Sequence, residues 1–433
     1  MKISAAKHSL HGQIHVPGSK SQTIRSVMLA TLAEGESVIR NPLPSKDGLA
    51  SLEAAKAFGA KVEQGENEWR IQGLGNHVSA PSKVVNTMNS GTTTSFVLGI
   101  AGLADGYTVV TGDEQIRHRP WKEETDALNE LGAEAVHTIP GSKCPPIVAH
   151  GPMKGGIAHL QGLSSQYTSG LLIPAALLPE GTVTELHVKT PMETPYVTMT
   201  EDFMRRFGAE VDTSDFHHIV VKGGQKYHGT DCTIDADWSS CAFPIVAAAC
   251  TDGSEVTILD VNFEDSQSDK RVADILTEMG ADITKDYENR SITIRGGKKL
   301  HGLKKIDMNA IPDSLPILCV AACRAEGDTV FTHLENIRLK ETDRVVTMHE
   351  VLTKCGADIE VLEDRMIVHG GKTLTGTEVP SFGDHRIAMA MSVCGLFAKG
   401  KMVIQDAQCA EVSFPKYYGL MNSIGASFGR EEA

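Results

Sequence analysis

The stretch FGAKVE, residues 58–63, closes an apolar helical pattern at Phe58 and opens an alternating, strand-like pattern at Lys61. Gly59 directly follows the predicted helix, at a position where the backbone turns left-handed and glycine does so at low cost. The same signature recurs five more times, as LGAEAV, FGAEVD, MGADIT, CGADIE and IGASFG. Its glycines are Gly59, Gly132, Gly208, Gly280, Gly356 and Gly425, each 69 to 76 residues after the one before. The repeat predicts six copies of one module that joins helices to strands.

A second series of glycines keeps step with the first. Each of these ends a helical pattern and leads into a β-branched run, as in EGESVI (34–39) and DGYTVV (105–110). The six are Gly35, Gly106, Gly181, Gly253, Gly327 and Gly400. A module of roughly 73 residues is too large for a solenoid repeat, so the 433 residues predict two α/β domains of three modules each. The polar stretch from Gln225 to Asp235 is the predicted boundary.

The composition is that of an ordinary globular protein, with 41% hydrophobic and 22% charged residues. A formal net charge of -14 without basic blocks argues against nucleic acid as a partner. No run of about 18 apolar residues is present, which argues against a membrane span, and the first residues show no secretory signal pattern. The nine cysteines include no C-x-x-C pair and no cluster with His at zinc spacing. We therefore expect a reducing, cytoplasmic location and no metal site.

Six polar segments each lead into an apolar helical pattern. They are GSKSQTIR (18–25), NSGTTTSF (89–96), LSSQYTSG (163–170), DWSSCAFP (237–244), IPDSLPIL (311–318) and GDHRIAMA (383–390). Their Ser, Asn and Asp residues suit helix N-caps, but one cap for each helix would be enough. The segments also carry Lys20, Gln166, Asp313, His385 and Arg386. Because a helix N-terminus already favours anions, the added cations predict a pocket for a highly anionic small molecule. Capped helices with solvated cations are the plainer alternative.

Eight short motifs, taken in chain order, resemble the 5-enolpyruvylshikimate-3-phosphate (EPSP) synthase family. They are PGSKSQTIR (17–25), NSGTT (89–93), RHRP (117–120), SSQ (164–166), PY (195–196), IPD (311–313), KETDR (340–344) and GDHR (383–386). The resemblance implies an α/β, two-domain enolpyruvyl transferase fold, with three pseudo-symmetric βαββαβ units in each domain arranged as an inside-out α/β barrel. The implied N-terminal domain covers residues 15–234, and the C-terminal domain covers 1–14 with 235–433. The active site is expected in the cleft between the domains.

The resemblance also implies an activity, that of a 3-phosphoshikimate 1-carboxyvinyltransferase in the shikimate pathway to aromatic amino acids. The enolpyruvyl group of phosphoenolpyruvate passes to the 5-hydroxyl of shikimate 3-phosphate, and phosphate leaves. The reaction goes through a tetrahedral ketal phosphate, so it needs a base, an acid and cations for the phosphates and carboxylates. No metal or cofactor is implied. The expected protein is a cytoplasmic monomer whose partners are these two small molecules.

The family's residue roles carry over to the matching positions. Asp313 is the implied base toward the 5-hydroxyl, Glu341 the implied acid and base at the methylene carbon, and Lys20 the implied aid to phosphate departure. The implied contacts of shikimate 3-phosphate are Lys20, Ser21, Arg25, Ser164, Ser165, Gln166, Tyr196, Asp313 and Lys340. The implied contacts of phosphoenolpyruvate are Lys20, Gly91, Arg119, Gln166, Arg344 and Arg386.

Four positions depart from the family pattern. Ser95 stands where arginine is usual, Phe96 where proline or leucine is common, and Val412 where many members have lysine. Glu193 replaces a serine that helps to hold the acceptor's phosphate, and a carboxylate there is unfavourable unless it turns away or pairs with a cation. Three alternatives stay open: a relative that acts on another cyclitol acid, a UDP-N-acetylglucosamine enolpyruvyl transferase, and a non-catalytic anion-binding module. The second is expected to carry a catalytic cysteine near RHRP, and GDEQIRHRPW (112–121) has none.

Overall fold

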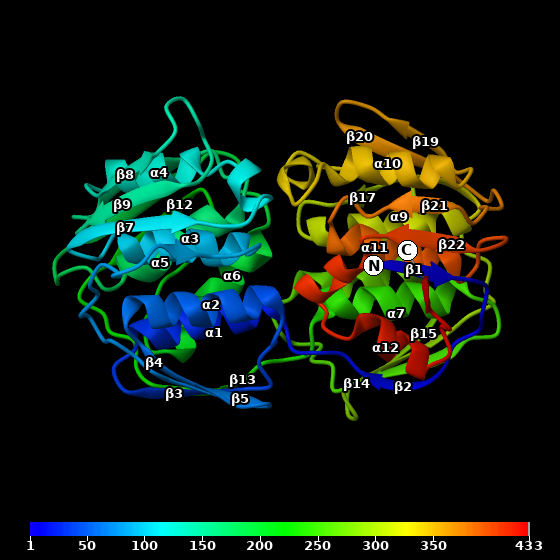
Figure 1. Ribbon diagram of the computed structural model, residues 1–433, viewed down its shortest axis with the longest axis horizontal. Coiled ribbons are helices and arrows are strands. Elements are labelled where there is room, and N and C mark those ends of the chain that lie inside the picture. The colour runs from blue at the N-terminus through cyan, green and yellow to red at the C-terminus, as the bar shows by residue number, and fades with distance from the viewer. Residues whose placement is uncertain (432–433) are drawn as a thin grey trace. The chain divides into compact units, whose positions relative to one another are not determined.

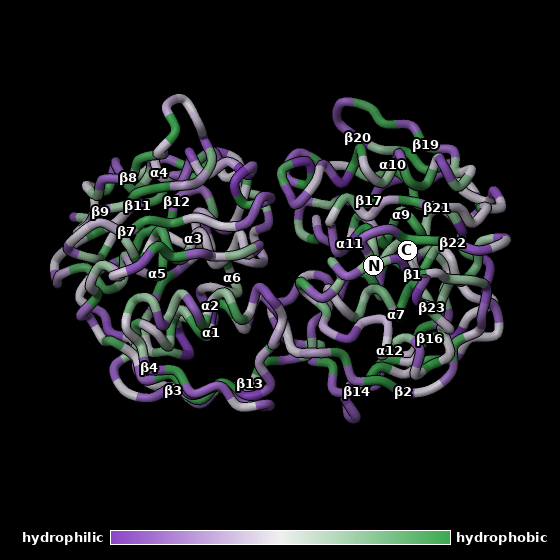
Figure 2. The backbone as a smooth tube through the Cα atoms, in the orientation of Figure 1, coloured by the Kyte–Doolittle hydropathy of each residue, from purple (hydrophilic) through white to green (hydrophobic). Residues whose placement is uncertain are grey.

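The computed structural model describes residues 1–431, and the chain divides into two compact units. The N-terminal unit is Gly18–Ile234, and the C-terminal unit combines Met1–Pro17 with Asp235–Ala433 (Figure 1). Each unit has a hydrophobic core built from its own residues. Figure 2 shows hydrophobic stretches, in green, running through the helices and strands of both units. Each unit can therefore be described as a folded body of its own.

The N-terminal unit contains three sheets, ordered β13-β3-β5-β4, β6-β7-β9-β8 and β10-β11-β12. Its strands are β3 (Glu36–Arg40), β4 (Lys61–Gln64), β5 (Glu68–Gln72), β6 (Val85–Asn86), β7 (Gly106–Thr111), β8 (Glu134–His137), β9 (Ile147–Gly151), β10 (Gly156–Leu160), β11 (Val183–Val188), β12 (His218–Lys222) and β13 (Asp231–Thr233). Its helices are α1 (Lys20–Leu32), α2 (Lys46–Phe58), α3 (Gly91–Ala101), α4 (Lys122–Glu130), α5 (Ser165–Ala175), α6 (Thr194–Arg206) and the short 3-10 helix η1 (Ile116–His118).

The C-terminal unit also contains three sheets, ordered β15-β16-β14-β2, β17-β18-β20-β19 and β21-β22-β1-β23. Its strands are β1 (Lys2–Ala5), β2 (His11–His15), β14 (Glu255–Leu259), β15 (Asp282–Asp286), β16 (Ser291–Arg295), β17 (Ile306–Asp307), β18 (Gly327–Thr332), β19 (Asp358–Val361), β20 (Arg365–Gly370), β21 (Glu378–Pro380), β22 (Met402–Gln405) and β23 (Gly429–Glu431). Its α-helices are α7 (Trp238–Cys250), α8 (Arg271–Glu278), α9 (Leu315–Arg324), α10 (Arg344–Lys354), α11 (His385–Gly395) and α12 (Tyr417–Ser423). Its 3-10 helices are η2 (Ser268–Lys270), η3 (Pro312–Ser314), η4 (Ile337–Leu339) and η5 (Ala407–Val412).

Six sheets confirm the six predicted modules, three in each unit. In the module β6-α3-β7-α4-β8-β9, β6 is parallel to β7, and β9 lies antiparallel between β7 and β8. The order along the chain is βαβαββ, which corrects the expected βαββαβ, because both antiparallel strands follow the second helix. All glycines of the two predicted series have positive φ, including Gly59 at 105° directly after α2.

Three helices of each unit are almost wholly buried, and the sheets lie outside them (Figure 1); these helices are α1, α3 and α5 in the N-terminal unit and α7, α9 and α11 in the C-terminal unit. Every residue of α7 and of α11 is buried, whereas strands such as β3 alternate between buried and exposed residues. A sheet with one face on the core and one face in solvent produces this alternation. Within residues 1–431 all six sheets are open, and none of them closes into a barrel of strands.

The chain passes between the units twice, and each passage separates a strand from the helix that follows it. Strand β2 pairs in parallel with β14 of the C-terminal unit, but the next helix, α1, belongs to the N-terminal unit. Strand β13 pairs in parallel with β3 of the N-terminal unit, but the next helix, α7, belongs to the C-terminal unit. In each unit, one sheet thus contains a strand that is followed along the chain by a helix of the other unit.

All six predicted polar segments begin buried helices, namely α1, α3, α5, α7, α9 and α11. Five of these helices have a side-chain cap, from Ser19, Ser90, Ser164, Asp237 and Asp384. The sixth, α9, is entered through η3, which carries Asp313. In the described part of the chain, no helix is long and apolar enough to cross a membrane.

Candidate active site

The N-terminal turns of α1, α3 and α5 lie close together in the N-terminal unit. The Ser95 hydroxyl of α3 donates a hydrogen bond of 2.7 Å to the main-chain oxygen of Gln166 in α5. The Arg25 guanidinium of α1 lies over the Phe96 ring of α3, 5.4 Å from its centroid. Because helix N-termini carry free N–H groups and partial positive charge, this cluster favours an anion.

Arg25 is almost fully buried and joins α1 to α6. Its guanidinium donates to Thr200 Oγ1 at 2.8 Å, to the main-chain oxygen of Tyr196 at 2.9 Å and to that of Ser21 at 3.2 Å. Burial lowers the pKa of Arg25 to about 10, and the charge of Glu193 acts in the opposite direction. Arg25 therefore contributes a buried positive charge whose hydrogen bonds are made largely to neutral oxygens.

Glu193 directly precedes α6, and its carboxylate lies at the N-terminus of α5. Its Oε2 atom accepts hydrogen bonds from the Ser165 main-chain N–H at 3.1 Å, the Ser165 hydroxyl at 3.0 Å and the Ser164 hydroxyl at 3.4 Å. The residue is 2% exposed and has a left-handed backbone, with φ 56°. The carboxylate thus takes the donors that an incoming anion would use, and it does so near the buried charge of Arg25.

Two further cations lie at this end of the N-terminal unit. Lys20 Nζ, at the start of α1, lies 3.2 Å from Oδ2 of the buried Asp47. Arg119 packs over Trp121 and against the backbone of Gly91, where an added Cβ would lie 2.7 Å from Arg119 Nη1. A glycine at position 91 therefore lets this guanidinium reach the start of α3.

Arg344 is the centre of a charge cluster in the C-terminal unit. It is fully buried, and its guanidinium contacts Asp384 at 2.8 Å, Asp313 at 2.8 Å and Glu341 at 2.7 Å. Burial disfavours the charged form, but Asp384, Glu341 and Asp313 outweigh it, so the pKa of Arg344 is raised. Arg344 therefore stays charged and fixes three carboxylates around one point.

Asp313 links this cluster to a second arginine. Its Oδ2 atom lies 3.0 Å from Arg386 Nη2, and its Oδ1 atom lies 4.0 Å from Lys340 Nζ. Asp269, a buried residue of η2, accepts hydrogen bonds from Ser239 of α7 and Ser314 of η3. Asp384 caps α11 by accepting the Arg386 main-chain N–H at 2.9 Å. The N-termini of α7, α9 and α11 are thus joined by carboxylates, with arginines among them.

The comparison with known proteins decides the family. A family model described as EPSP synthase (3-phosphoshikimate 1-carboxyvinyltransferase) matches residues 5–421. This chain belongs to the EPSP synthase family.

Relatives and solved structures of this family match the chain from end to end. It is 40% identical over 435 residues to a 3-phosphoshikimate 1-carboxyvinyltransferase of Methanocorpusculum labreanum, covering 100% of both chains. It is 39% identical over 426 residues to the Acetivibrio thermocellus protein of the same name, covering 98% of this chain and 99% of the relative. An EPSP synthase structure from Acinetobacter baumannii aligns over 100% of both chains, with a TM-score of 0.83 and 31% identity.

In this EPSP synthase family member, the residues singled out from the sequence form two clusters, one in each unit. The N-terminal unit brings together Lys20, Ser21, Arg25, Gly91, Arg119, Ser164, Ser165, Gln166 and Tyr196 around the starts of its helices. The C-terminal unit brings together Asp313, Lys340, Glu341, Arg344 and Arg386. Arg117, named beside Arg119 in the RHRP motif, is exposed and bonds to the Gly112 oxygen instead.

Sequence reasoning missed the carboxylates that hold these clusters in place. Asp47, Asp269 and Asp384 contact Lys20, Ser314 and Arg344, respectively. Asp384 and Asp47 stand at helix starts, where an acidic residue is common as a cap. The sequence alone therefore does not distinguish a role in orienting a cation from a role in capping. The sequence marks Glu193 only as a departure from the family pattern, because its contact with Ser164 and Ser165 depends on the fold.

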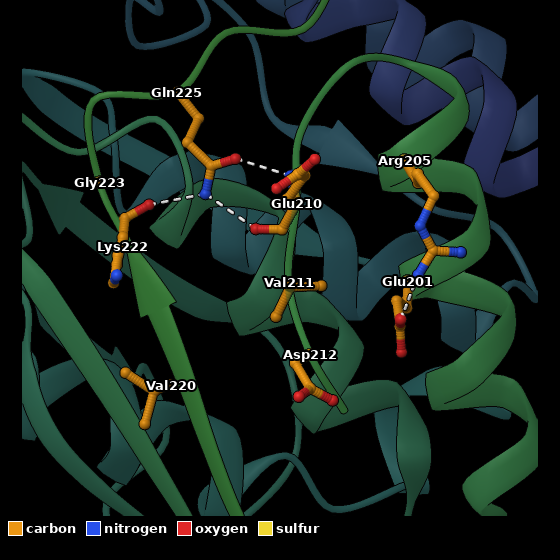
Figure 3. Close-up of a pocket in the computed structure, with 9 residues that line it drawn as sticks. All are labelled: Glu201, Arg205, Glu210, Val211, Asp212, Val220, Lys222, Gly223 and Gln225. Atoms are coloured by element: carbon orange, nitrogen blue, oxygen red, sulfur yellow. Dashed lines mark hydrogen bonds and ion pairs between the residues drawn. The ribbon is translucent and has the colours of Figure 1, made fainter. Parts of the chain in front are cut away.

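A separate pocket of about 680 Å³ lies in the N-terminal unit, lined by Glu201, Arg205, Glu210, Val211, Asp212, Val220, Lys222, Gly223 and Gln225 (Figure 3). The described lining contains none of the site residues expected from the sequence. Its walls come from α6, from β12 and from the loops beside them. The pocket is therefore distinct from the helix-start cluster.

Proposed function

We propose that both clusters bind the same pair of substrates and transfer the enolpyruvyl group of phosphoenolpyruvate to the 5-hydroxyl of shikimate 3-phosphate. The products are 5-enolpyruvylshikimate 3-phosphate and phosphate. This is the reaction of a 3-phosphoshikimate 1-carboxyvinyltransferase, the name that the relatives carry. The substrates together bring two phosphates and two carboxylates, so the enzyme must supply several fixed cations.

The observation that carries the proposal is the position of Asp313 and Glu341 on Arg344. Both carboxylates contact the same buried guanidinium, at 2.8 Å and 2.7 Å, and Asp313 also contacts Arg386 at 3.0 Å. Each carboxylate beside these cations weakens their attraction for an anion, and Asp384 already orients Arg344 at 2.8 Å, so binding alone does not require two more. Two oriented carboxylates do suit a reaction in which one proton leaves a hydroxyl and another joins a carbon.

In the proposed first step, the 5-hydroxyl oxygen attacks the central carbon of phosphoenolpyruvate and gives up its proton to Asp313. Glu341 delivers a proton to the methylene carbon, which becomes a methyl group, and the tetrahedral ketal phosphate forms. In the second step Glu341 takes one of the methyl protons back, and the carbon–oxygen bond to phosphate breaks. Lys20 assists that departure, and Arg344 and Arg386 hold the negative charge of phosphoenolpyruvate.

The remaining predicted contacts divide between the substrates as the family implies. Shikimate 3-phosphate uses Ser21, Arg25, Ser164, Ser165, Gln166, Tyr196 and Lys340 in addition to Lys20 and Asp313. Phosphoenolpyruvate uses Gly91, Arg119 and Gln166 in addition to Lys20, Arg344 and Arg386. We further propose a monomer in the cytoplasm. The nine cysteines, all within the described residues, are free thiols, which suits a reducing compartment. Size-exclusion chromatography with light scattering tests the monomer.

Phosphate release tests the activity and the two carboxylates. The protein should release phosphate only when phosphoenolpyruvate and shikimate 3-phosphate are both present, with an organic product heavier than the acceptor by one enolpyruvyl group. Asp313→Asn and Glu341→Gln keep the shape of each side chain and remove its acid–base function. Turnover should fall by about a hundredfold or more in each variant.

The exposed Glu363 provides a matched control, because Glu363→Gln makes the same chemical change away from the cluster. This control should keep turnover within about twofold of the unaltered protein, since surface changes of this kind have small effects. Near-normal turnover in Asp313→Asn or Glu341→Gln would reassign that residue. Release of phosphate from phosphoenolpyruvate without the acceptor would contradict the transfer reaction itself.

A further inference from the structure

Three histidines stand in a row across the outer face of the β10-β11-β12 sheet. His159 of β10 is in register with His187 of β11, and His187 is in register with His218 of β12. Their neighbouring rings are 5.5 Å and 4.6 Å apart between centroids. Glu185, two residues before His187 on β11, points to the same face because side chains alternate along a strand. This face is solvated, whereas the intervening Leu186 and Ile219 are buried in the core.

Glu185, His187 and His218 converge on one point. Oε2 of Glu185 lies 2.9 Å from Nε2 of His218 and 3.5 Å from Nε2 of His187. The ligand atoms of the three residues all lie within 4.8 Å of one another. Zinc binds imidazole nitrogen and carboxylate oxygen at about 2.0–2.2 Å, so its tetrahedral ligands stand about 3.3 Å apart. The observed separations bracket that value.

The His187 imidazole gives a second, independent indication. Its Nε2 atom is shielded from solvent and has no hydrogen-bond partner among the described residues. A shielded polar atom without a hydrogen bond is unfavourable, and a metal ion bound at its lone pair would remove that cost.

We propose that Glu185, His187 and His218 form a binding site for a divalent transition-metal ion, with Zn²⁺ as the natural occupant. Two imidazole nitrogens and one carboxylate oxygen are typical ligands of Zn²⁺, whereas Mg²⁺ and Ca²⁺ bind mainly oxygen. The fourth position is open to water. The ion joins β11 to β12, which is the edge strand of its sheet. The site lies on the same sheet face as Val220, which is paired with Glu185 and lines the pocket in Figure 3.

The ligands need little rearrangement to bind the ion. All three come from the adjacent, hydrogen-bonded strands β11 and β12, whose register fixes their backbone positions. Sites built on such rigid elements hold their geometry better than sites on loops. His159 stands outside the group, because its Nδ1 atom lies 3.2 Å from Oε2 of Glu130. It therefore serves as an internal control on the same face.

Zinc titration of the full-length protein tests the proposal. The protein is first treated with a chelator and dialysed, and Zn²⁺ binding is then measured by isothermal titration calorimetry. His187→Asn, His218→Asn and Glu185→Gln should each weaken binding at this site at least tenfold, while His159→Asn should change it by less than twofold. Bound Cu²⁺ should show coupling to two imidazole nitrogens in its electron paramagnetic resonance spectrum, and to one in His187→Asn or His218→Asn.

The outcomes separate a site from ordinary histidine–metal affinity. Melting temperatures measured without metal show whether each variant is folded, and only folded variants are compared. Equal zinc affinity in the unaltered protein, His187→Asn and His218→Asn would overturn the proposal. A loss in His159→Asn as large as in the other two would also overturn it, because the binding would then belong to the exposed histidine row as a whole.

Discussion

Glu193 is a single residue that changes how the start of α5 can work. Three hydrogen-bond donors of Ser164 and Ser165 meet its carboxylate, and the buried Arg25 lies within its electrostatic reach. These hydrogen bonds, with the nearby positive charge of Arg25, explain how a buried carboxylate is tolerated there. In the proposed reaction the acceptor's phosphate needs these same donors, so it must displace Glu193 or share them with it.

Replacing Glu193 should therefore tighten binding of the acceptor. In Glu193→Ser the donors of Ser164 and Ser165 and the charge of Arg25 become available to the phosphate. A hydrogen bond to a charged group contributes about 1.5–3 kcal/mol, so the KM for shikimate 3-phosphate should fall about tenfold. The KM for phosphoenolpyruvate should change little. Steady-state kinetics with each substrate varied in turn measure both constants.

Two controls accompany that measurement. Glu180→Ser removes an exposed glutamate of the same unit and should leave both constants unchanged. Glu193→Gln keeps the length of the side chain and removes its charge, so it should give a smaller decrease in the same direction. An unchanged or higher KM for shikimate 3-phosphate in folded Glu193→Ser would show that the phosphate binds elsewhere.

Asp265 should make the stability of the C-terminal unit depend on pH. Burial raises the pKa of Asp265 to about 7, from 3.8, and the charge of nearby Asp235 acts in the same direction while Lys270 opposes it. Between these pH values the folded protein holds a proton that the unfolded chain releases, so stability falls as pH rises from about 4 to 7. Asp265→Asn should reduce this fall in melting temperature. Asp105→Asn, at an exposed position, is the control and should leave the fall unchanged. An equal fall of melting temperature with pH in the unaltered protein and in both variants would contradict the assignment.

At the scale of elements, α3 and α5 pack with their backbones unusually close. A Cβ added to Gly99 of α3 would lie 1.9 Å from the main-chain oxygen of Gly170 in α5. A Cβ added to Gly170 would lie 2.5 Å from Oε1 of the buried Glu124 and 2.7 Å from the Ser95 hydroxyl. These glycines therefore set the distance between two helices whose starts belong to the proposed site.

Gly99→Ala should separate the two helices and destabilise the N-terminal unit. Overpacking of a core costs about 1–3 kcal/mol, and a clash with backbone leaves little room to relax, so the upper end of that range is expected. Gly419→Ala is the matched control, because nothing lies within 4 Å of the added atom and the residue is in α12. Urea denaturation compares the two. Similar midpoints for Gly99→Ala and the unaltered protein would show that the helices can move apart freely.

Much of the element structure could be predicted from the sequence because its signals are local. Gly59 and its five counterparts mark helix ends through their own backbone preference, and Ser19, Ser90 and Ser164 mark helix starts through their own hydrogen bonds. The pairing of distant strands leaves no such signal. The convergence of Glu185 and His187 with His218 depends on the register of β11 and β12, and the position of Glu193 depends on how α6 meets α5.

At the scale of the whole molecule, the formal charge of -14 contrasts with the cations gathered at the helix starts. If both clusters bind one pair of substrates, those anions link the two units and favour arrangements in which both clusters reach them. The radius of gyration measured by small-angle X-ray scattering should therefore decrease when shikimate 3-phosphate and phosphoenolpyruvate are added to Asp313→Asn, which binds without turning over. Sodium sulfate at equal ionic strength controls for screening. An unchanged radius at saturating ligand would contradict a shared site.

The two passages of the chain between its units have a consequence for synthesis on the ribosome. The N-terminal unit is one continuous segment whose last strand, β13, ends at Thr233, so it can fold as soon as that residue has left the exit tunnel. Strands β1 and β2 are made before it, but they pair with β14, β22 and β23, which begin only at residues 255, 402 and 429. Residues 1–17 therefore cannot complete their strand pairing until those later strands have been made. Strand pairing in the C-terminal unit thus joins segments made before the N-terminal unit to segments made after it.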